Sequence, residues 1–492
     1  MISNARIADT LAGDGHDVTI LIAEFRVKYN QVSPPKKAKA IIFDGIDGSV
    51  FDKGQESLTA NTFGPDEALF DKLFYDTSFF DAFNTQCDEM LRLHRNKLAE
   101  LADEHFDMLF TEQLNLCGTG LKPLLNITTH MWISSCPLDD HMGYLLSVPT
   151  PLSYVPAVGE ISVSDDMSFY ERLLNVFEFS KNVRSYFYGM QQTNAVYQKH
   201  FGPTFPNLID VAADSALTFV LADEFLDFPR PILHNTIFVG GLGMNLQQTL
   251  TSTYSDELQK GKKGVIFFSL GTNIESSSIP VAFKKNLLSA FKHFSDYHFI
   301  AKFEANDKEV HELASDIPNV KITNWAPQPE ILAHERLSLF ITHGGYNSLL
   351  EAALYAKPLL LMPIFGDQWR NAQLAQRNKF GRVFDKRTLL TSPDKFIEAL
   401  NELLTNQMYK THAARIQKLI KTKPLNSTER FLRYTQFVGD NEGHLDELHI
   451  AGRRLSSVKY FNIDIILALL VILSILPIVI FVIISKLANF RN

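Results

Sequence analysis

The carboxyl-terminal segment carries a long apolar stretch, and this stretch limits how the whole chain can be arranged. Every residue from 465 to 484 is apolar except Ser474, and Pro477 is the one residue there that disfavours a helix interior. A helix of about 20 apolar residues crosses the roughly 30 Å of hydrocarbon in a bilayer. A helix buried in a protein core usually keeps a polar face over such a length. The pattern therefore predicts a transmembrane helix at residues 463–485, followed by a short tail at residues 486–492.

The residues around the predicted helix leave its orientation open. Basic residues stand on both sides of it: Lys486 and Arg491 after it, and Arg453, Arg454 and Lys459 before it. The positive-inside rule is therefore not decisive. Two Asn-x-Ser/Thr sequons, at residues 126–128 and 426–428, permit a main body on the lumenal side of a membrane.

Composition narrows the class of protein and of partner. The 492 residues are 46% hydrophobic, which is enough to fill two globular cores. The net charge of −8 comes from interspersed acidic and basic residues. No basic field of the kind that binds a phosphate backbone is present, so we expect a small-molecule substrate and no nucleic acid. The three cysteines, Cys87, Cys117 and Cys136, lie far apart without a CxxC pair, which argues against a zinc ribbon or a disulfide scaffold and predicts buried small apolar side chains.

The amino-terminal half alternates helix-like and strand-like runs in the α/β manner. Residues 5–12 predict an amphipathic helix and residues 16–22 a strand, which together form half of a βαβ unit. A parallel crossover also needs a strand before the helix. We therefore expect the natural start to lie upstream of Met1, or the chain to be a shortened form. The aromatic-rich stretch at residues 169–197 is expected to be mostly core, with some rings lining an apolar acceptor pocket.

One acidic residue in this half stands where ligands collect in α/β proteins. The strand predicted at residues 106–112 ends in Glu112. Ligands bind beyond the carboxyl ends of strands in open parallel sheets, so Glu112 is a candidate for chemistry. A carboxylate that only starts a helix is an equally good interpretation of this position.

A second α/β region follows the prolines at residues 228–231. Residues 264–272 predict a buried strand in which Gly271 lets the backbone approach a ligand. A strand at residues 339–343, a Gly-Gly turn, a helix at residues 347–356 and a strand at residues 358–363 form a βαβ unit. The amino terminus of that helix offers free N–H groups to a phosphate, and His343 can reach the same place. Ser348 and Glu351 also match a capping box, in which Glu351 merely closes the helix start.

These residues together resemble the signature of the UDP-glycosyltransferases, and of the UDP-glucuronosyltransferases in particular. The matching segments are Trp325-Ala326-Pro327-Gln328, the run from His343 to Ala352, Pro358-Leu359-Leu360-Leu361-Met362-Pro363 and Phe365-Gly366-Asp367-Gln368-Trp369-Arg370-Asn371. The resemblance extends to Arg6-Ile7-Ala8-Asp9, to Phe228-Pro229-Arg230-Pro231 with Gly240-Gly241, to Phe268-Ser269-Leu270-Gly271 and to the membrane helix, and so covers nearly the whole chain.

The resemblance implies an α/β fold of the GT-B type, with two Rossmann-like domains facing a cleft and one carboxyl-terminal transmembrane helix. Residues 1–235 would form the acceptor domain and residues 236–450 the UDP-sugar domain with a return helix. Trp325 would stack on uracil with Gln328 near the base and ribose, and Glu351 would bind the ribose hydroxyls. The diphosphate would lie among Ser269, Gly271, His343, Gly345, Asn347 and Ser348, and the sugar would contact Asp367 and Gln368.

The implied reaction is displacement at the anomeric carbon with inversion, and it uses neither a metal nor a cofactor. Glucuronic acid or another hexose would pass from a UDP-sugar to a hydroxyl of a small lipophilic acceptor, with His343 stabilising the diphosphate. Glu112 matches the acidic residue that supports the family's base, a histidine whose position falls immediately before Met1; His16 belongs to a different element. The implied location is the endoplasmic reticulum membrane, with a lumenal body. The alternative is an inactive membrane-bound relative that partners active enzymes, and homo- or hetero-oligomers are left open.

Overall fold

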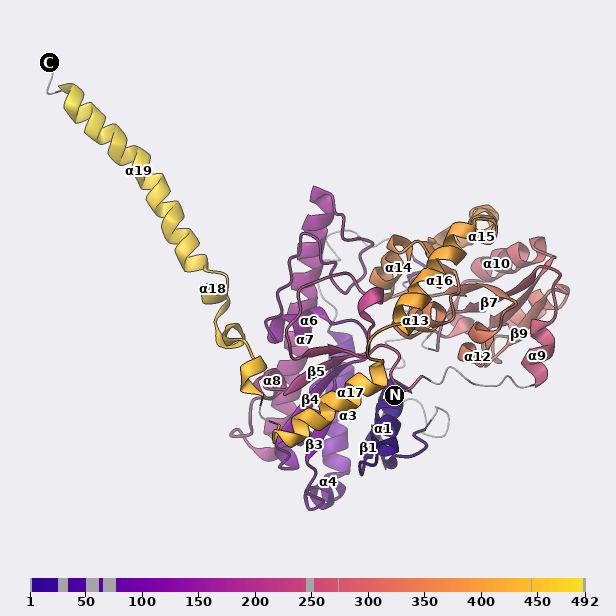
Figure 1. Cartoon of the computed structure of the whole chain (residues 1–492), viewed down its shortest axis with the longest axis horizontal. Coiled ribbons are helices and arrows are strands. Elements are labelled where there is room, and N and C mark those ends of the chain that lie inside the picture. The colour runs from indigo at the N-terminus through magenta and orange to yellow at the C-terminus, as the bar shows by residue number, and fades with distance from the viewer. Residues whose placement is uncertain are drawn as a thin grey trace.

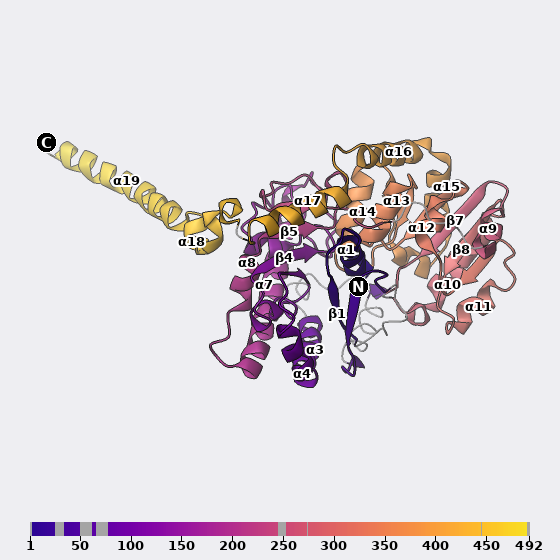
Figure 2. The same ribbon diagram turned by 60° about the horizontal axis from the view of Figure 1, so that its bottom comes forward.

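The computed structural model describes residues 2–24, 34–49, 62–64, 77–244, 252–272, 274–443 and 445–489. Two α/β regions lie next to each other, and a single long helix extends away from the first of them (Figure 1). The same arrangement is seen from a second direction (Figure 2).

The first region is built on parallel strands in two groups. Four strands pair in the order β3-β4-β5-β6. Their bounds are Met108–Glu112, Thr129–Ser134, Leu217–Val220 and Thr236–Phe238. A separate pair, β1 (Thr19–Ala23) and β2 (Lys39–Phe43), is also parallel. Among the described residues β1 and β3 are therefore edge strands, each with one hydrogen-bonded neighbour.

The second region is one six-stranded parallel sheet with the order β12-β11-β10-β7-β8-β9. Its strands in chain order are β7 (Gly264–Ser269), β8 (Tyr297–Lys302), β9 (Val320–Thr323), β10 (Leu337–Thr342), β11 (Leu359–Leu361) and β12 (Gly381–Val383). The central strand β7 is buried along its whole length, as its apolar sequence predicts. Strand order reverses beside β7 and β10, which is where open α/β sheets leave a crevice for ligands.

Helices cover both sheets. The longer ones are α1 (Ile2–Gly13), α3 (Ser78–Leu93), α4 (Arg95–Ala102), α7 (Phe169–Phe201), α10 (Val281–His293), α13 (Tyr346–Leu354), α14 (Gln368–Arg377), α15 (Asp394–Thr405), α16 (Gln407–Lys421) and α17 (Ser427–Asp440). The shorter ones are α5 (Leu121–Leu124), α6 (Asp140–Leu145), α8 (Leu208–Ala213), α9 (Ser252–Leu258), α11 (Lys308–Ala314), α12 (Gln328–Ala333) and α18 (Ser457–Tyr460). The 3-10 turns are η3 (Glu224–Leu226), η4 (Ser276–Ser278), η5 (Lys386–Leu390), η6 (Asp446–Leu448) and η7 (Ala451–Arg454).

The chain crosses back to the first region at its end. The ring of Phe431 on α17 lies 4.8 Å from the ring of Phe219 and 5.9 Å from that of Phe110, measured between centroids. Strand β6 also belongs to the first sheet, because it pairs with β5. The sheet of the first region therefore extends a few residues past position 235.

Two expectations from the sequence are wrong. Cys87 on α3 and Cys117 after β3 form a disulfide with a Cα–Cα distance of 5.9 Å, although they are 30 residues apart and lack any spacing motif. Cys136 is the free cysteine of the described chain. The aromatic side chains at the start of α7 are also not core, since Phe169, Tyr170 and Phe177 are exposed.

The apolar carboxyl-terminal stretch forms α19 (Ile463–Asn489), which includes one candidate membrane span at Ile463–Lys486. Its mean hydropathy is 3.4, and none of the span is buried against the rest of the chain. A helix of this length and composition is expected to be covered by lipid.

Candidate functional site

His343 directly follows β10, and two nearby glycines leave very little space around its ring. A Cβ atom added to Gly271, in the loop after β7, would lie 2.8 Å from the His343 ring. A Cβ atom added to Gly345 would lie 2.6 Å from Nε2 of the same ring. The backbone at Gly271 also has a φ of +87°, a conformation that side chains disfavour. Both glycines are therefore needed for the two loops to close around the imidazole.

The imidazole of His343 is neutral at physiological pH. Burial and the positive charge of Lys302 lower the pKa of His343 to about 4. Lys302 itself donates a 2.7 Å hydrogen bond to the carbonyl of Gly271. The carboxyl ends of β8 and β10 thus bring a lysine and a neutral imidazole to the loop after β7. The first turn of α13 adds free backbone N–H groups and the exposed side chain of Asn347, while Ser269 bonds the N–H of Gly271 at 3.3 Å.

A second cluster lies beside α13 and brings together Gln328 and Glu351, which were expected near the nucleoside, and Ser348, which was expected near the diphosphate. Gln328 Nε2 donates to Ser348 Oγ at 3.1 Å and to Glu351 Oε2 at 2.8 Å. The amino-terminal cap of α13 is Gly345, without a side-chain cap bond, and Ser348 and Glu351 are buried within the helix. The capping-box alternative is therefore wrong. Burial raises the pKa of Glu351, although the hydrogen bond from Gln328 and the charge of Arg6 oppose the rise.

Trp325 stands at the edge of this cluster with its indole 56% exposed. Lys302 Nζ lies 5.7 Å from the ring centroid, and the hydroxyl of Tyr254 donates to the Trp325 carbonyl. A large aromatic ring left this exposed beside a polar cluster is available to stack on a planar ligand.

Asp367 and Gln368 lie at the start of α14 but differ in their surroundings. Asp367 accepts a 2.8 Å hydrogen bond from Asn371, and burial raises the pKa of Asp367 to about 6. Gln368 is buried, and its side-chain oxygen accepts from the N–H groups of Ile364 and Phe365 at 2.9 Å and 3.2 Å. Gln368 therefore shapes the loop before α14 with its oxygen, which leaves its amide nitrogen for any ligand.

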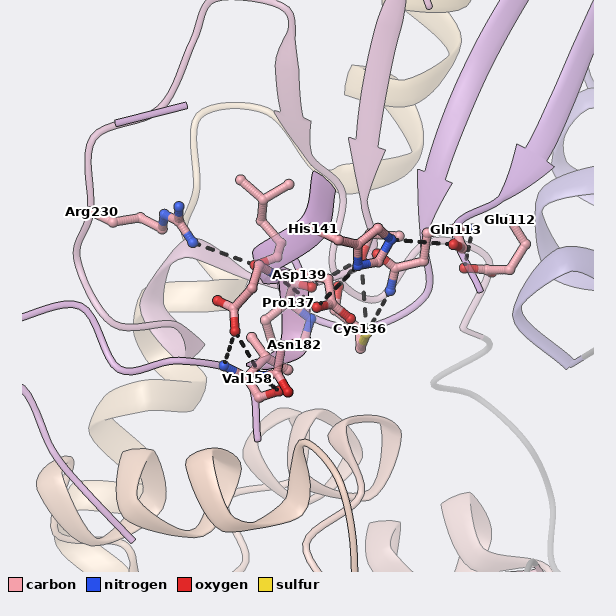
Figure 3. Close-up of polar contacts among 12 residues, drawn as sticks. Glu112, Gln113, Cys136, Pro137, Asp139, His141, Val158, Asn182 and Arg230 are labelled. Atoms are coloured by element: carbon pink, nitrogen blue, oxygen red, sulfur yellow. Dashed lines mark hydrogen bonds and ion pairs between the residues drawn. The ribbon is translucent and has the colours of Figure 1, made fainter. Parts of the chain in front are cut away.

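The first region contributes Glu112 at the carboxyl end of β3. Its Oε1 accepts hydrogen bonds from the N–H groups of Gln113 at 3.0 Å and Ser135 at 3.3 Å (Figure 3). Burial raises the pKa of Glu112, although these two hydrogen bonds oppose the rise. The carboxylate is thus fixed across the ends of β3 and β4, as the strand-end rule predicts, and it does not start a helix.

A polar group that sequence reasoning missed lies next to Glu112 in Figure 3. His141 Nδ1 is 3.3 Å from Asp139 Oδ1, and its Nε2 is 3.3 Å from the Gln113 carbonyl. The ring of His141 is fully buried and stacks on Tyr186 at 3.7 Å. It therefore orders the loop after β4 from a buried position. The run Asp139-Asp140-His141 follows the end of β4, so the strand-end rule that selected Glu112 could also have pointed to it.

The two halves of the site face each other closely enough for their charges to interact. Burial raises the pKa of Cys136 well above its usual value, and the negative charges of Asp367, Asp139 and Glu112 add to the rise. Asp367 comes from the second region, whereas Asp139 and Glu112 come from the first. Acidic groups of both regions thus converge near the thiol.

A buried ion pair holds the start of α14 against the first region. Arg370 Nη1 lies 2.6 Å from Asp227 Oδ1, and both side chains are almost completely buried. Arg370 Nε also donates to the Pro156 carbonyl at 3.1 Å. Its guanidinium carbon lies 5.0 Å from the ring centroid of Phe228. Asp367 and Gln368, two or three residues earlier, are positioned through this contact.

Comparison with known proteins identifies this architecture. The family described as UDP-glucoronosyl and UDP-glucosyl transferase matches residues 1–491. The chain belongs to this family. It is 36% identical over 478 residues to the putative UDP-glucuronosyltransferase ugt-47 of Caenorhabditis elegans, covering 95% of this chain and 86% of that protein. It is 29% identical over 451 residues to UDP-glucuronosyltransferase 3A1 of Mus musculus, covering 88% and 81% of the two chains.

Solved structures of other glycosyltransferases show that the fold is GT-B. The glycotransferase of kitacinnamycin superposes with a TM-score of 0.61 at 18% identity and covers 90% of this chain and 95% of its own. Os79 from O. sativa, solved in complex with UDP, superposes with a TM-score of 0.60 at 15% identity, covering 89% and 97%. The expected fold class is confirmed, and the chain is a UDP-glycosyltransferase with a candidate membrane anchor.

We expect the Arg370–Asp227 pair to hold the two domains of this transferase together. Arg370→Gln should leave a buried carboxylate without its partner, at a cost of roughly 3–5 kcal/mol. The unfolding temperature of the detergent-solubilised enzyme should fall, and adding Asp227→Asn should cost less than the sum of the two single changes.

Arg377→Gln is the matched control, because Arg377 on the same helix pairs with Asp165 at 2.6 Å in a partly exposed position. Its loss should cost about 1 kcal/mol or less. Equal destabilisation by Arg370→Gln and Arg377→Gln would contradict the role assigned to the buried pair.

Proposed function

We propose that this enzyme transfers glucuronic acid, or another hexose, from its UDP-sugar to a hydroxyl of a small lipophilic acceptor with inversion at the anomeric carbon. The observation that carries the proposal is the meeting of two half-sites. The loops around His343 offer hydrogen-bond donors for a diphosphate, and a fixed carboxylate, Glu112, stands in the opposite domain. The names of the relatives support glucuronic acid as the donated sugar.

The donor would lie along the first turn of α13. Trp325 would stack on uracil, and Gln328 and Glu351 would hold the base and ribose. The diphosphate would contact Ser269, Gly271, His343, Gly345, Asn347 and Ser348. Asp367 and the amide nitrogen of Gln368 would receive the sugar hydroxyls. UDP-sugar is the substrate here, and no cofactor is proposed.

Transfer requires the acceptor oxygen to lose a proton as it attacks the anomeric carbon, while the bond to the UDP oxygen breaks. Negative charge then grows on the diphosphate. A neutral His343 would stabilise this negative charge by donating a hydrogen bond. The start of α13 adds backbone N–H groups and a positive dipole. Glu112 would stabilise the base that removes the acceptor proton. The base becomes positively charged when it takes that proton, and a buried carboxylate favours a neighbouring positive charge.

The disulfide supports a lumenal main body. Disulfides persist in oxidising compartments, including the lumen of the endoplasmic reticulum, and are rare in the cytosol. Cys87 and Cys117 are joined within the first domain. We therefore propose a protein with one membrane span in the endoplasmic reticulum, with both domains in the lumen.

Transfer to a small phenol by the full-length enzyme in membranes tests this proposal. Product is expected from UDP-glucuronic acid, with UDP-glucose compared in parallel. Trp325→Ala should raise the KM for the donor about 5- to 150-fold, because stacking on a base contributes about 1–3 kcal/mol.

Phe437→Ala is the control, since Phe437 is similarly exposed but lies on α17 outside the site. An unchanged donor KM in Trp325→Ala would rule out the stacking role. Absence of transfer from every UDP-sugar would rule out the proposed reaction.

His343 should act mainly in the transition state. His343→Ala is expected to lower kcat by about 10²–10³-fold, as loss of one preorganised donor does elsewhere, while UDP-sugar binding changes much less. Single-turnover rates and calorimetric affinities measure the two effects separately.

His311→Ala provides the comparison, because His311 is exposed on α11 and lies outside the site. Weaker binding at an unchanged saturated rate would make His343 a residue that only positions the donor.

A further inference from the structure

The first turns of α7 expose an unusual amount of apolar surface. The exposed side chains are Phe169 (76%), Tyr170 (56%), Leu173 (42%), Val176 (43%) and Phe177 (49%). At about 100° per residue these positions fall within one third of the helix circumference. We call these five residues the α7 apolar strip.

The opposite face of the same turns is polar and buried. Asn175 is completely buried, and its Nδ2 donates to the carbonyls of Leu152 and Val155, each at 2.8 Å. Its Oδ1 accepts from the N–H of Ala157 at 2.7 Å. Glu178 is also buried, where it accepts from the N–H of Glu160 at 3.2 Å and pairs with Lys181 at 2.7 Å.

This arrangement reverses the usual amphipathic pattern, in which a surface helix buries its apolar face. Asn175 and Glu178 anchor the polar face through satisfied hydrogen bonds, so rotating the helix to bury the strip would break them. The start of the helix is also fixed by a capping box between Ser168 and Glu171. The strip is therefore a permanent surface feature, of a kind that marks an interaction site.

The strip is physically connected to the point where the chain enters the membrane. The Tyr144 hydroxyl on α6 bonds the Ser457 hydroxyl at 2.9 Å, six residues before the span begins at Ile463. The Tyr144 ring also packs on Phe187 of α7, with centroids 5.6 Å apart. At a rise of about 1.5 Å per residue, Phe177 and Phe169 lie about 15 Å and 27 Å along α7 from Phe187.

The segment before the span continues the apolar surface. Leu455, Val458 and Phe461 are each about half exposed. In Figure 1 the amino-terminal end of α7 and helix α19 both lie on the upper side of the first domain. Aromatic side chains are favoured at the boundary between lipid and water, and the strip includes two phenylalanines and a tyrosine.

We propose that the α7 apolar strip is inserted into the interfacial layer of the same bilayer that α19 spans. The strip would hold the first domain against the membrane surface at a second point besides the span. The test below distinguishes the bilayer from other groups that could cover the strip, such as a second copy of the chain.

The test uses the full-length enzyme at one copy per lipid nanodisc, which excludes a second chain. Leu173→Cys and Phe177→Cys are each labelled with an environment-sensitive fluorophore, and the unsubstituted chain treated in the same way gives the background from Cys136. Gln191→Cys is the matched control, because Gln191 is exposed on the same face of α7 but about 27 Å from Leu173 along the helix. UDP binding by each labelled variant shows that it is folded.

We expect blue-shifted emission at positions 173 and 177, strong quenching by spin-labelled lipid and weak quenching by aqueous iodide. Position 191 should show the reverse. Three results would overturn the proposal: full iodide access at 173 and 177, shielding there without quenching by lipid, or equal lipid quenching at position 191. Shielding without lipid quenching would show that protein covers the strip.

Discussion

The two half-sites of this transferase act on one reaction only if they are held face to face, and the buried pair between Arg370 and Asp227 does this. Arg370 belongs to α14, whose first residues form the proposed sugar subsite, and Asp227 belongs to the domain that carries Glu112. Taking two charges out of water is costly, and the close approach of the opposite charges offsets part of that cost. The ion pair thus links domain contact directly to the position of Asp367.

The proposed chemistry depends on how closely the backbone packs around the imidazole of His343. Gly271 and Gly345 leave no room for a side chain, so the loops after β7 and β10 close on His343. Enclosure and the charge of Lys302 lower the pKa of His343 to about 4, so the ring would meet the proposed diphosphate as a neutral hydrogen-bond donor. The same parallel strands that bury the apolar core therefore also build the polar donor site at their carboxyl ends.

Local patterns predicted β7, β10, β11 and the helix α13, because these three strands are largely buried apolar runs and a Gly-Gly turn follows β10. The convergence of Gln328, Ser348 and Glu351 followed from family resemblance; local pattern alone left a capping box open for Ser348 and Glu351. Long-range pairings were not predictable. The Cys87–Cys117 disulfide, the Arg370–Asp227 pair and the burial of His141 depend on contacts between distant segments. The exposed start of α7 was missed because an aromatic-rich run looks the same in a core and at a membrane surface.

Hydrogen–deuterium exchange of the full-length enzyme with and without UDP tests the central claim, that the donor lies along the start of α13. The account predicts slower exchange at residues 269–272, 325–328 and 343–351, with no change at residues 259–263, which precede β7 at the opposite end of the sheet. Protection confined to residues 259–263, or to the first domain, would contradict it.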